Sequence, residues 1–374
     1  MKTTKPKLLV IGQLPPPVHG STVMADRFMQ ALRRNGFDAR MLQKTFSRRM
    51  DDVGRVTISK IVRIPSHCAQ LVRVIREFTP ELCVFFISVG MTALAVDALL
   101  LRILRHHKIP YVLYFHGKGY SRNHTNGNTM QRMIAADALG SAHGGMVLGE
   151  RLKSDVEGFM HRERLHVVPN GVPDIERPAG KSTRDSENVQ VLFLSNLVKT
   201  KGPMEFLKMA ALVRKETARV RFKMVGRAVD ARFHEEVFSF RREQMLEDVV
   251  EILGPLYGKE KEEVLNDTDI LVFPTYKDTF PLVNLEAMQH SIPVVSSNEG
   301  AIPDIVRDGI NGFIVDPKNI PKLAAKTLAL VQDPALRRRM GQAGRELYEK
   351  HYTIEAYERN VREAMHRFLS GKVK

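Results

Sequence analysis

Two acidic residues eight positions apart follow a short apolar stretch in the second half of the chain. The apolar stretch Ile270–Phe273 predicts a buried strand that ends at a proline, and Asp278 lies in the turn that follows. A helix is expected to begin near Pro281 and to carry Glu286, with an apolar face formed by Leu282, Leu285, Ala287 and Met288.

This spacing predicts a binding site for phosphate and sugar. Ligands of parallel sheets bind beyond the carboxyl ends of the strands, and the free amides at the start of a helix favour anions. We therefore expect Asp278 in the loop and Glu286 in the helix to flank such a site. The alternative is an ordinary strand–helix unit with a surface acid at each end, because acids are common at helix starts.

A second candidate site follows the first expected strand, in residues 15–22. Gly20 permits the close approach of a ligand to the backbone, and the hydroxyl residues after it can cap the next helix. His19 is a candidate to face that ligand, and the alternative is that it fills the turn.

Short apolar runs alternate with helical patterns along the chain, which predicts parallel sheets covered by helices. In the first half the expected strands are 8–12, 82–87, 111–115, 145–148 and 166–168. In the second half they are 191–194, 221–225, 250–253, 270–273, 293–296 and 312–315. Residues 173–188 have the composition of a linker. Two helices are expected after Pro334, with a break near residues 351–353.

Size and composition predict a globular protein of about two domains. Single cores stop growing at roughly 250–300 residues, and this chain has 374. An apolar content of 43% and a charged content of 26% are typical of soluble globular proteins. The two cysteines, Cys68 and Cys83, have neither metal-ligand spacing nor a disulfide framework, so we expect buried free thiols in a reducing compartment.

The sequence shows no targeting or membrane-spanning segment. Residues 8–12 are too short for the apolar core of a signal peptide. The apolar stretches 82–91 and 93–101 are interrupted by polar residues and by glycine, and each is shorter than the roughly 20 residues needed to span a bilayer. We expect a cytoplasmic protein.

Positive charge is concentrated in the first half of the chain. Residues 1–185 hold 28 Lys and Arg against 15 Asp and Glu, whereas residues 186–374 hold 29 against 27. The densest segment, 48–78, predicts a basic amphipathic helix that lies on an anionic membrane surface. The alternative is a core helix with a solvated basic face. Nucleic acid is not expected as a partner, because the chain has no zinc-finger spacing, RNA-binding aromatic motif or arginine-rich tail.

Six motifs in order resemble the retaining glycosyltransferases of family four. They occupy residues 168–172, 194–202, 253–256, 273–288, 298–306 and 308–313. The resemblance covers most of the chain and implies the α/β GT-B fold, with two facing Rossmann-like domains, parallel sheets and a C-terminal crossover helix. It implies an acceptor domain in residues 1–175 and a nucleotide-sugar domain in residues 176–350. Residues 351–374 would then form a helix that packs back on the first domain.

The resemblance also implies roles for individual residues. Lys201 resembles the cation that stabilises the leaving diphosphate, Asp278 the acid near the sugar hydroxyls, and Glu286 the acid that accepts the ribose hydroxyls. His116 resembles a histidine near the transferred sugar, where it would bond a hydroxyl or steady developing charge, although a histidine at a strand end is often structural. The remaining donor-binding candidates are Gly20, Asn196, Gly226, Leu256 and the backbone amides of Phe280, Pro281 and Leu282. The acceptor-binding candidates are His19, Lys118 and Arg122.

Two residues depart from the family pattern. Asn196 stands where the family usually has arginine, with Lys199 as the candidate to replace that cation, and Asp278 stands where the family usually has glutamate. A degenerate, non-catalytic nucleotide-sugar-binding protein is therefore one alternative, and a GT-B-fold sugar-nucleotide epimerase is another.

The predicted function is that of a retaining glycosyltransferase. It would move a sugar from a nucleotide-sugar donor, with a UDP-sugar favoured, to a lipid-linked or saccharide acceptor in cell-surface polysaccharide or lipopolysaccharide biosynthesis. The resemblance implies same-face attack by the acceptor hydroxyl, with no cofactor and no obligatory metal. The basic first half places the enzyme peripherally at the inner face of the membrane.

Overall fold

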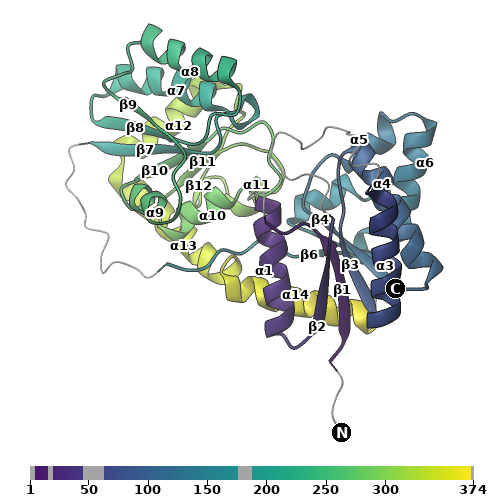
Figure 1. The fold of residues 1–374 in the computed structure, drawn as a ribbon. Helices are drawn as coiled ribbons and strands as arrows, with labels where there is room; N and C mark the ends of the chain where they lie inside the picture. The colour runs from purple at the N-terminus through teal and green to yellow at the C-terminus, as the bar shows by residue number, and fades with distance from the viewer. Residues whose placement is uncertain (1–4, 16–19, 45–62, 176–187, 372–374) are drawn as a thin grey trace. The chain divides into compact units, whose positions relative to one another are not determined.

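The computed structural model describes residues 5–15, 20–44, 63–175 and 188–371, except for the side chains of Asn123 and His124. These residues form two compact units (Figure 1). Unit 1 comprises residues 1–170 and 355–374, and unit 2 comprises residues 171–354. Each unit contains a six-stranded parallel sheet, so the predicted α/β class with two parallel sheets is confirmed.

The sheet of unit 1 has the strand order β2-β1-β3-β4-β5-β6. Its strands are β1 (Lys7–Gly12), β2 (Asp38–Gln43), β3 (Leu82–Phe86), β4 (Tyr111–Phe115), β5 (Gly144–Val147) and β6 (Leu165–Val167). Its helices are α1 (Gly20–Arg34), α3 (Ile64–Phe78), α4 (Met91–His106), α5 (Tyr120–Thr125) and α6 (Thr129–Gly140), with the short 3-10 turns η2 (Glu150–Asp155) and η3 (Arg162–Arg164).

Every residue of β3 and β4 is buried, as expected for central strands covered on both faces by helices. The sequence identified these strands as continuous apolar runs. It missed β2, which is an edge strand in which only Leu42 is buried. An edge strand needs no continuous apolar run, because one side of it meets solvent, and this pattern is difficult to recognise without the structure.

The sheet of unit 2 has the strand order β12-β11-β10-β7-β8-β9. Its strands are β7 (Val189–Leu194), β8 (Val220–Val225), β9 (Val250–Leu253), β10 (Ile270–Phe273), β11 (Val294–Ser296) and β12 (Gly312–Ile314). Its helices are η4 (Lys199–Lys201), α7 (Pro203–Glu216), α8 (Ala231–Glu243), α9 (Gly258–Asn266), α10 (Leu282–Gln289), α11 (Ile302–Ile305), α12 (Ile320–Gln332) and α13 (Pro334–His351).

The strand order of unit 2 reverses between β7 and β10. The chain runs outward from β7 through β8 to β9, and then returns to β10 on the opposite side of β7. In an open parallel sheet this reversal leaves a crevice beyond the carboxyl ends of the two strands, which is where ligands bind. The loops that follow β7 and β10 are therefore the first place to look for a site.

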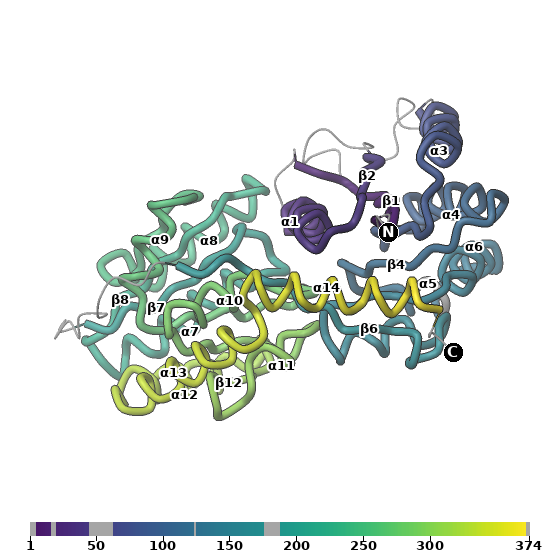
Figure 2. Tube along the Cα trace, turned by 90° about the horizontal axis from the view of Figure 1, so that it is seen from below, coloured from purple at the N-terminus to yellow at the C-terminus, as the bar shows by residue number. Residues whose placement is uncertain are grey.

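The helix α14 (Ile354–Leu369) belongs with unit 1 although it follows unit 2 in the chain (Figure 2). It contacts unit 1 at three places along its length. Arg34 pairs with Glu358 at 2.7 Å, Phe37 lies against His366 with ring centroids 5.5 Å apart, and His166 lies against Phe368 at 4.9 Å.

The boundary between the units differs slightly from the predicted limits of 175 and 351. Residues 171–174 are fixed to unit 2, because Gln289 donates to the Pro173 carbonyl at 2.5 Å and Arg345 holds Asp174 at 2.6 Å. Tyr352 also stays with unit 2, where its hydroxyl donates to the Asp304 carbonyl at 3.0 Å. These contacts move the boundaries to Asn170 and Ile354.

The basic segment 48–78 is described only from residue 63 onward, and the rest lies outside the described residues. The described part, α3, buries Leu71, Ile75 and Phe78 and exposes Arg73 and Arg76. This matches a core helix with a solvated basic face. Among the helices of the described residues, none is long and apolar enough to cross a bilayer.

Candidate functional site

The loops after β7 and β10 are fastened to each other at the Thr200 carbonyl. Thr275 donates its hydroxyl to that carbonyl at 3.0 Å, and the amides of Tyr276 and Lys277 donate to it at 2.8 and 3.2 Å. The two loops at the reversal point of the sheet therefore form one structure, and side chains from both can act at one place.

Lys201 and Asp278 meet across these two loops. Lys201 Nζ lies 2.6 Å from Asp278 Oδ2 and 3.0 Å from the Lys277 carbonyl oxygen. The two side chains are 24% and 17% exposed, so the pair is largely shielded from water. The structure thus brings together two of the three residues expected to be catalytic, and it places a cation at the carboxyl edge of the sheet.

The backbone after Lys201 accounts for the glycine at position 202. Gly202 has φ +79°, and a Cβ there would lie 2.1 Å from the Pro274 carbonyl oxygen. Only glycine fits both the left-handed conformation and the close approach of the β10 loop. Gly226, at the end of β8, is similarly close, because a Cβ there would lie 1.8 Å from the Ser195 carbonyl oxygen. Its packing against the β7 loop thus explains this glycine without a ligand.

The helix α10 begins after Pro281, as the sequence predicts. Phe280 is buried and packs against Tyr352, with ring centroids 6.2 Å apart. The expected amide of Pro281 is a mistake, because proline has no backbone N–H to donate. The first-turn amides of α10 therefore begin with Leu282, and those without an intrahelical partner are able to donate to an anion.

Glu286, in the second turn of α10, is paired with Lys261 of α9. Lys261 Nζ lies 2.8 Å from Glu286 Oε1. Sequence reasoning identified Glu286 and missed Lys261. The only available signal for Lys261 was its place in a short helix after the expected base-contacting loop, and that signal is too weak to single out one of the two lysines of α9.

The other donor-binding candidates in unit 2 lie at the same edge of the sheet. Asn196 is exposed in the β7 loop, and Leu256 is half-buried between β9 and α9. Lys199, the candidate to replace the expected arginine, turns toward α8, where its Nζ lies 3.5 Å from Glu236 and 5.5 Å from the centre of the Phe233 ring.

Arg227 is a further exposed cation at this edge, and sequence reasoning did not identify it. Its carbonyl accepts the Leu197 amide at 2.9 Å, so it is adjacent to the loop that carries Asn196.

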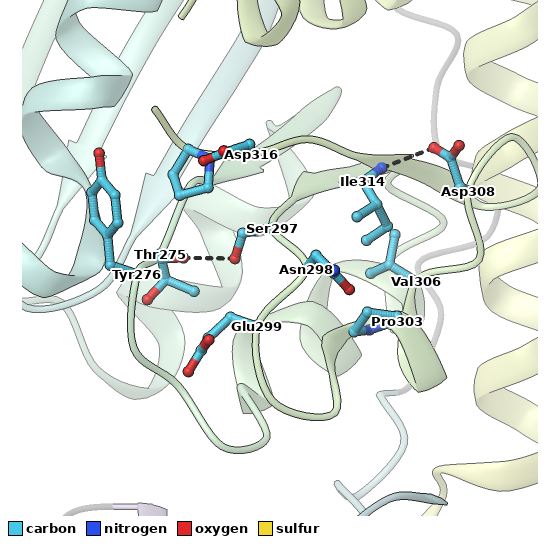
Figure 3. Close-up of a pocket in the computed structure, with 11 residues that line it drawn as sticks. Thr275, Tyr276, Ser297, Asn298, Glu299, Pro303, Val306, Asp308, Ile314 and Asp316 are labelled. Carbon is cyan, nitrogen blue, oxygen red and sulfur yellow. Dashed lines mark hydrogen bonds between the residues drawn. The ribbon is translucent and has the colours of Figure 1, made fainter. Parts of the chain in front are cut away.

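A cavity of about 670 Å³ opens at the carboxyl ends of β10, β11 and β12 (Figure 3). Its walls are fixed by a hydrogen bond of 2.6 Å from Ser297 to the Thr275 carbonyl and by one of 2.9 Å from the Ile314 amide to Asp308. The lining residues are Thr275, Tyr276, Ser297, Asn298, Glu299, Pro303, Val306, Asp308, Ile314, Asp316 and Pro317. Three of them are carboxylates and none is basic, so the cavity suits a neutral, hydroxyl-bearing group better than a phosphate.

In unit 1, His116 follows β4 at the carboxyl edge of the sheet. Its ring stacks on Phe86 with centroids 5.0 Å apart at 15°, and it meets the edge of Tyr114 at 4.1 Å. Burial lowers the pKa of His116 to about 3, so the imidazole is neutral near pH 7. Its buried Nε2 has no hydrogen-bond partner among the described residues. A neutral ring with a spare nitrogen suits a bond to a hydroxyl, and it does not suit the alternative role of a fixed positive charge.

The acceptor candidates of unit 1 lie around α5. Asp155 fixes the start of this helix by accepting the Gly119 amide at 2.6 Å and the Ser121 hydroxyl at 2.8 Å. Lys118 and Arg122 are exposed on either side of these bonds.

Gly20 and His19 complete the sequence-based candidates of unit 1. Gly20 begins α1, and a Cβ there would meet nothing within 4 Å, so the packing of the chain does not itself require glycine. His19 lies outside the described residues.

Two family models match consecutive parts of this chain. The model described as Glycosyltransferase Family 4 matches residues 18–175, and that described as Glycosyl transferases group 1 matches residues 174–347. This chain belongs to the glycosyltransferases. The family resemblance carried by the six motifs is thereby confirmed.

Curated relatives of this glycosyltransferase match only part of its length. The D-inositol 3-phosphate glycosyltransferase of Paenarthrobacter aurescens (strain TC1) is 28% identical over 190 residues, which are 48% of this chain and 46% of the relative. The sulfoquinovosyl transferase SQD2 of Arabidopsis thaliana is 36% identical over 101 residues, 26% of this chain and 20% of the relative. The matched part thus spans about half, or less, of these relatives.

Solved glycosyltransferase structures match almost the whole chain in fold. The sucrose-phosphate synthase of Thermosynechococcus elongatus has a TM-score of 0.76 at 15% identity, over 98% of this chain and 100% of that one. Anabaena HepE in complex with UDP-glucose has a TM-score of 0.72 at 18% identity, over 96% and 99%. The lipopolysaccharide outer core galactosyltransferase WaaB has a TM-score of 0.73 at 16% identity, over 96% and 99%. The GT-B architecture expected from the motifs is confirmed.

Proposed function

We propose that this glycosyltransferase transfers a sugar from a nucleotide-sugar donor to a saccharide or lipid-linked acceptor, with a UDP-sugar as the favoured donor. The observation that carries the proposal is the Lys201–Asp278 pair, 2.6 Å apart at the reversal point of the unit 2 sheet and close in sequence to the start of α10. A lysine and free helix amides suit a diphosphate, and a carboxylate beside them suits sugar hydroxyls. The acidic cavity next to the β10 loop adds a second place for hydroxyl-bearing groups.

In the proposed reaction the bond between the sugar anomeric carbon and the diphosphate oxygen breaks while the acceptor oxygen bonds to the same carbon. Lys201 and the first amides of α10 stabilise the negative charge that grows on the leaving diphosphate. The proton of the acceptor hydroxyl passes to a phosphate oxygen of that leaving group. Attack from the same face retains the anomeric configuration. The role of His116 in this proposal is the one that the family resemblance implies, a bond to a hydroxyl of the sugar, and its neutral ring, with Nε2 unpartnered among the described residues, suits that role.

Transfer to a cell-surface polysaccharide or lipopolysaccharide is supported by the likeness in fold to WaaB, a lipopolysaccharide outer core galactosyltransferase. The choice of donor is supported by the likeness in fold to HepE, which was solved in complex with UDP, with UDP and glucose, and with UDP-glucose. Location at the inner face of the membrane rests on the excess of basic residues in the first half of the chain. Activity without a bound metal rests on the family resemblance and is tested by assay in EDTA.

The experiment is a thermal-stability screen of the purified chain with UDP-, GDP-, ADP- and CMP-sugars. A bound ligand well above its dissociation constant raises the free energy of unfolding by about 3 kcal/mol. We expect one nucleotide class to stabilise the wild type and to lose most of this effect with Lys201→Ala or Glu286→Ala. Lys208→Ala, on the exposed side of α7, is the matched control and keeps the effect.

Donors that stabilise the chain are then incubated with saccharide and lipid-linked acceptors, and the anomeric configuration of the product is determined by NMR. A stabilising donor that is isomerised without an acceptor would identify an epimerase, and one that is never turned over would identify a binding protein. If no nucleotide sugar stabilises the wild type, the donor site is wrong.

A further inference from the structure

Lys261 is joined to Glu286, the acid expected to bind ribose, from a different helix. The atoms Nζ and Oε1 lie 2.8 Å apart, and the side chains are 26% and 20% exposed. A charge pair that is largely shielded from water is stronger and better fixed than an exposed surface pair. Lys261 therefore restricts where the Glu286 carboxylate can lie.

A second contact between α9 and α10 lies beside the first. Glu262, the next residue of α9, has Oε2 at 3.1 Å from His290 Nε2, and the His290 ring is 2% exposed. On its other side His290 Nδ1 lies 2.7 Å from the backbone carbonyl oxygen of Glu286. Two consecutive residues of α9 thus reach the same turn of α10, one at the Glu286 side chain and one through its backbone.

The pair leaves the carboxylate able to accept hydrogen bonds. Lys261 occupies one lone pair of Oε1, and among the described residues Oε2 has no partner. An ionised carboxylate offers about four acceptor positions, so both hydroxyls of a vicinal diol can still bond to it. Lys261 consequently holds Glu286 without taking the positions that a ribose would use.

The charge of Lys261 serves a second purpose in the same place. A nucleoside diphosphate brings negative charge to the edge that already carries Asp278 and Glu286. Like charges a few ångströms apart repel in a site shielded from water. Asp278 is paired with Lys201, and Glu286 is paired with Lys261, so each acid has its own cation from another element.

We propose that Lys261 is a positioning residue for ribose recognition, which fixes the Glu286 carboxylate and offsets its charge so that it accepts the ribose hydroxyls of the donor. This inference rests on the proposed function, since it needs a nucleotide at this edge. It adds a specificity role that lies outside the two-acid motif.

The test measures the preference for ribose over deoxyribose by titration calorimetry, with UDP and 2′-deoxy-UDP on the full chain. If another base binds more tightly, its two diphosphates replace these. A hydrogen bond to a charged group corresponds to roughly tenfold to hundredfold in affinity, so we expect the wild type to prefer UDP by at least about tenfold. In Lys261→Met the preference falls to about threefold or less, because the carboxylate is no longer held. Lys261→Arg, which keeps the charge and the donors, restores most of it.

Lys259→Met is the matched control. Lys259 lies on the same helix, is 90% exposed and is 3.7 Å from Glu263, so its removal leaves the ribose preference unchanged. Far-UV circular dichroism checks that each variant is folded. If Lys261→Met is not folded, Lys261→Leu replaces it as the variant that removes the lysine charge.

Two outcomes overturn the inference alone. An unchanged preference in Lys261→Met, whatever happens to total affinity, shows that Glu286 is placed without the lysine. A larger preference shows that Lys261 competes with ribose for the carboxylate. Absence of binding of any nucleoside diphosphate to the wild type is a different result, because it refutes the proposed function before any variant is compared.

Discussion

A buried charge pair in unit 1 allows a quantitative test of how the carboxyl edge of that sheet is held. Lys44, directly after β2, is 9% exposed and lies 2.8 Å from Asp97 of α4, which is 1% exposed. Lys44 also donates to the Phe86 carbonyl at 2.7 Å, and Asp97 accepts the Ser88 amide at 2.8 Å. The pair therefore joins the ends of two strands to a helix.

Removing one partner leaves the other charged and buried, which typically costs about 3–5 kcal/mol. We expect both Lys44→Met and Asp97→Leu to destabilise unit 1 by this amount. The double variant buries two apolar side chains of suitable size and removes the partners of the Ser88 amide, the Ser88 hydroxyl and the Phe86 carbonyl. Its cost should be about 2–4 kcal/mol, which is well below the sum of the two single costs, so the double-mutant cycle should give a coupling of about 5 kcal/mol.

The chain has no tryptophan, so hydrogen exchange measured by mass spectrometry is the better assay. A loss of about 3 kcal/mol speeds exchange through opening by roughly a hundredfold. We expect this in peptides from β3 and α4 of each single variant, whereas peptides from β10 of unit 2 serve as the internal control. Single-variant effects that simply add in the double variant would refute the reasoning, since they would show that the two charges do not depend on each other.

Three further predictions concern single positions. His116 has a pKa of about 3 in the folded chain and an ordinary value of 6.5, so between these values only the unfolded chain takes up the proton. The contribution of neutral His116 to stability is therefore complete above pH 6.5 and decreases as the pH is lowered below it. In urea unfolding, His116→Gln should remove about 2 kcal/mol of the stability loss between pH 7 and pH 5, and an unchanged loss would contradict the argument. Asn284 is fully buried and neither polar atom of its amide has a partner among the described residues, so Asn284→Leu should raise the free energy of unfolding by about 1–2 kcal/mol; a decrease would show that bound water satisfies the amide. Gly202→Ala should lower the free energy of unfolding by at least about 3 kcal/mol in a melting experiment, because a Cβ would lie 2.1 Å from the Pro274 carbonyl oxygen. The control Gly309→Ala, at φ +77° with nothing within 4 Å of a Cβ, should lower it by only about 1 kcal/mol through backbone strain. Equal losses would mean that the Pro274 loop moves aside.

The sequence predicted the fold well where the signal was local. The eleven expected strands all correspond to strands of the two sheets, because central parallel strands are continuous apolar runs and can be found one at a time. The missed strand β2 shows the limit of this reasoning. Its residues alternate between exposed and half-buried, with Leu42 alone buried, and it becomes a strand through its pairing with β1.

The roles expected for the site residues stay predictions, and the structure shows only how they are arranged. It brings Lys201, which the resemblance indicated, to Asp278 of the motif. Nothing in the local pattern indicated that Lys199 would turn away toward Glu236 on α8, because that contact depends on where α8 lies. The neutral state of His116 was equally beyond the sequence, since it follows from burial against Phe86 and Tyr114.

The two acids and their two lysines show why a local motif describes only half of a charged site. The spacing between Asp278 and Glu286 is fixed by one loop and two turns of one helix, so it is visible in the sequence. Their partners are 77 and 25 residues away, at Lys201 and Lys261, and the fold brings them there. Lys201 arrives because the sheet reverses between β7 and β10, and Lys261 because α9 packs beside α10. Each acid of this motif has its charge offset by a cation from elsewhere in the fold, as the proposed binding of a diphosphate beside them requires. On that proposal, a substitution distant in sequence from the motif, at Lys201 or Lys261, changes donor recognition as strongly as one within it.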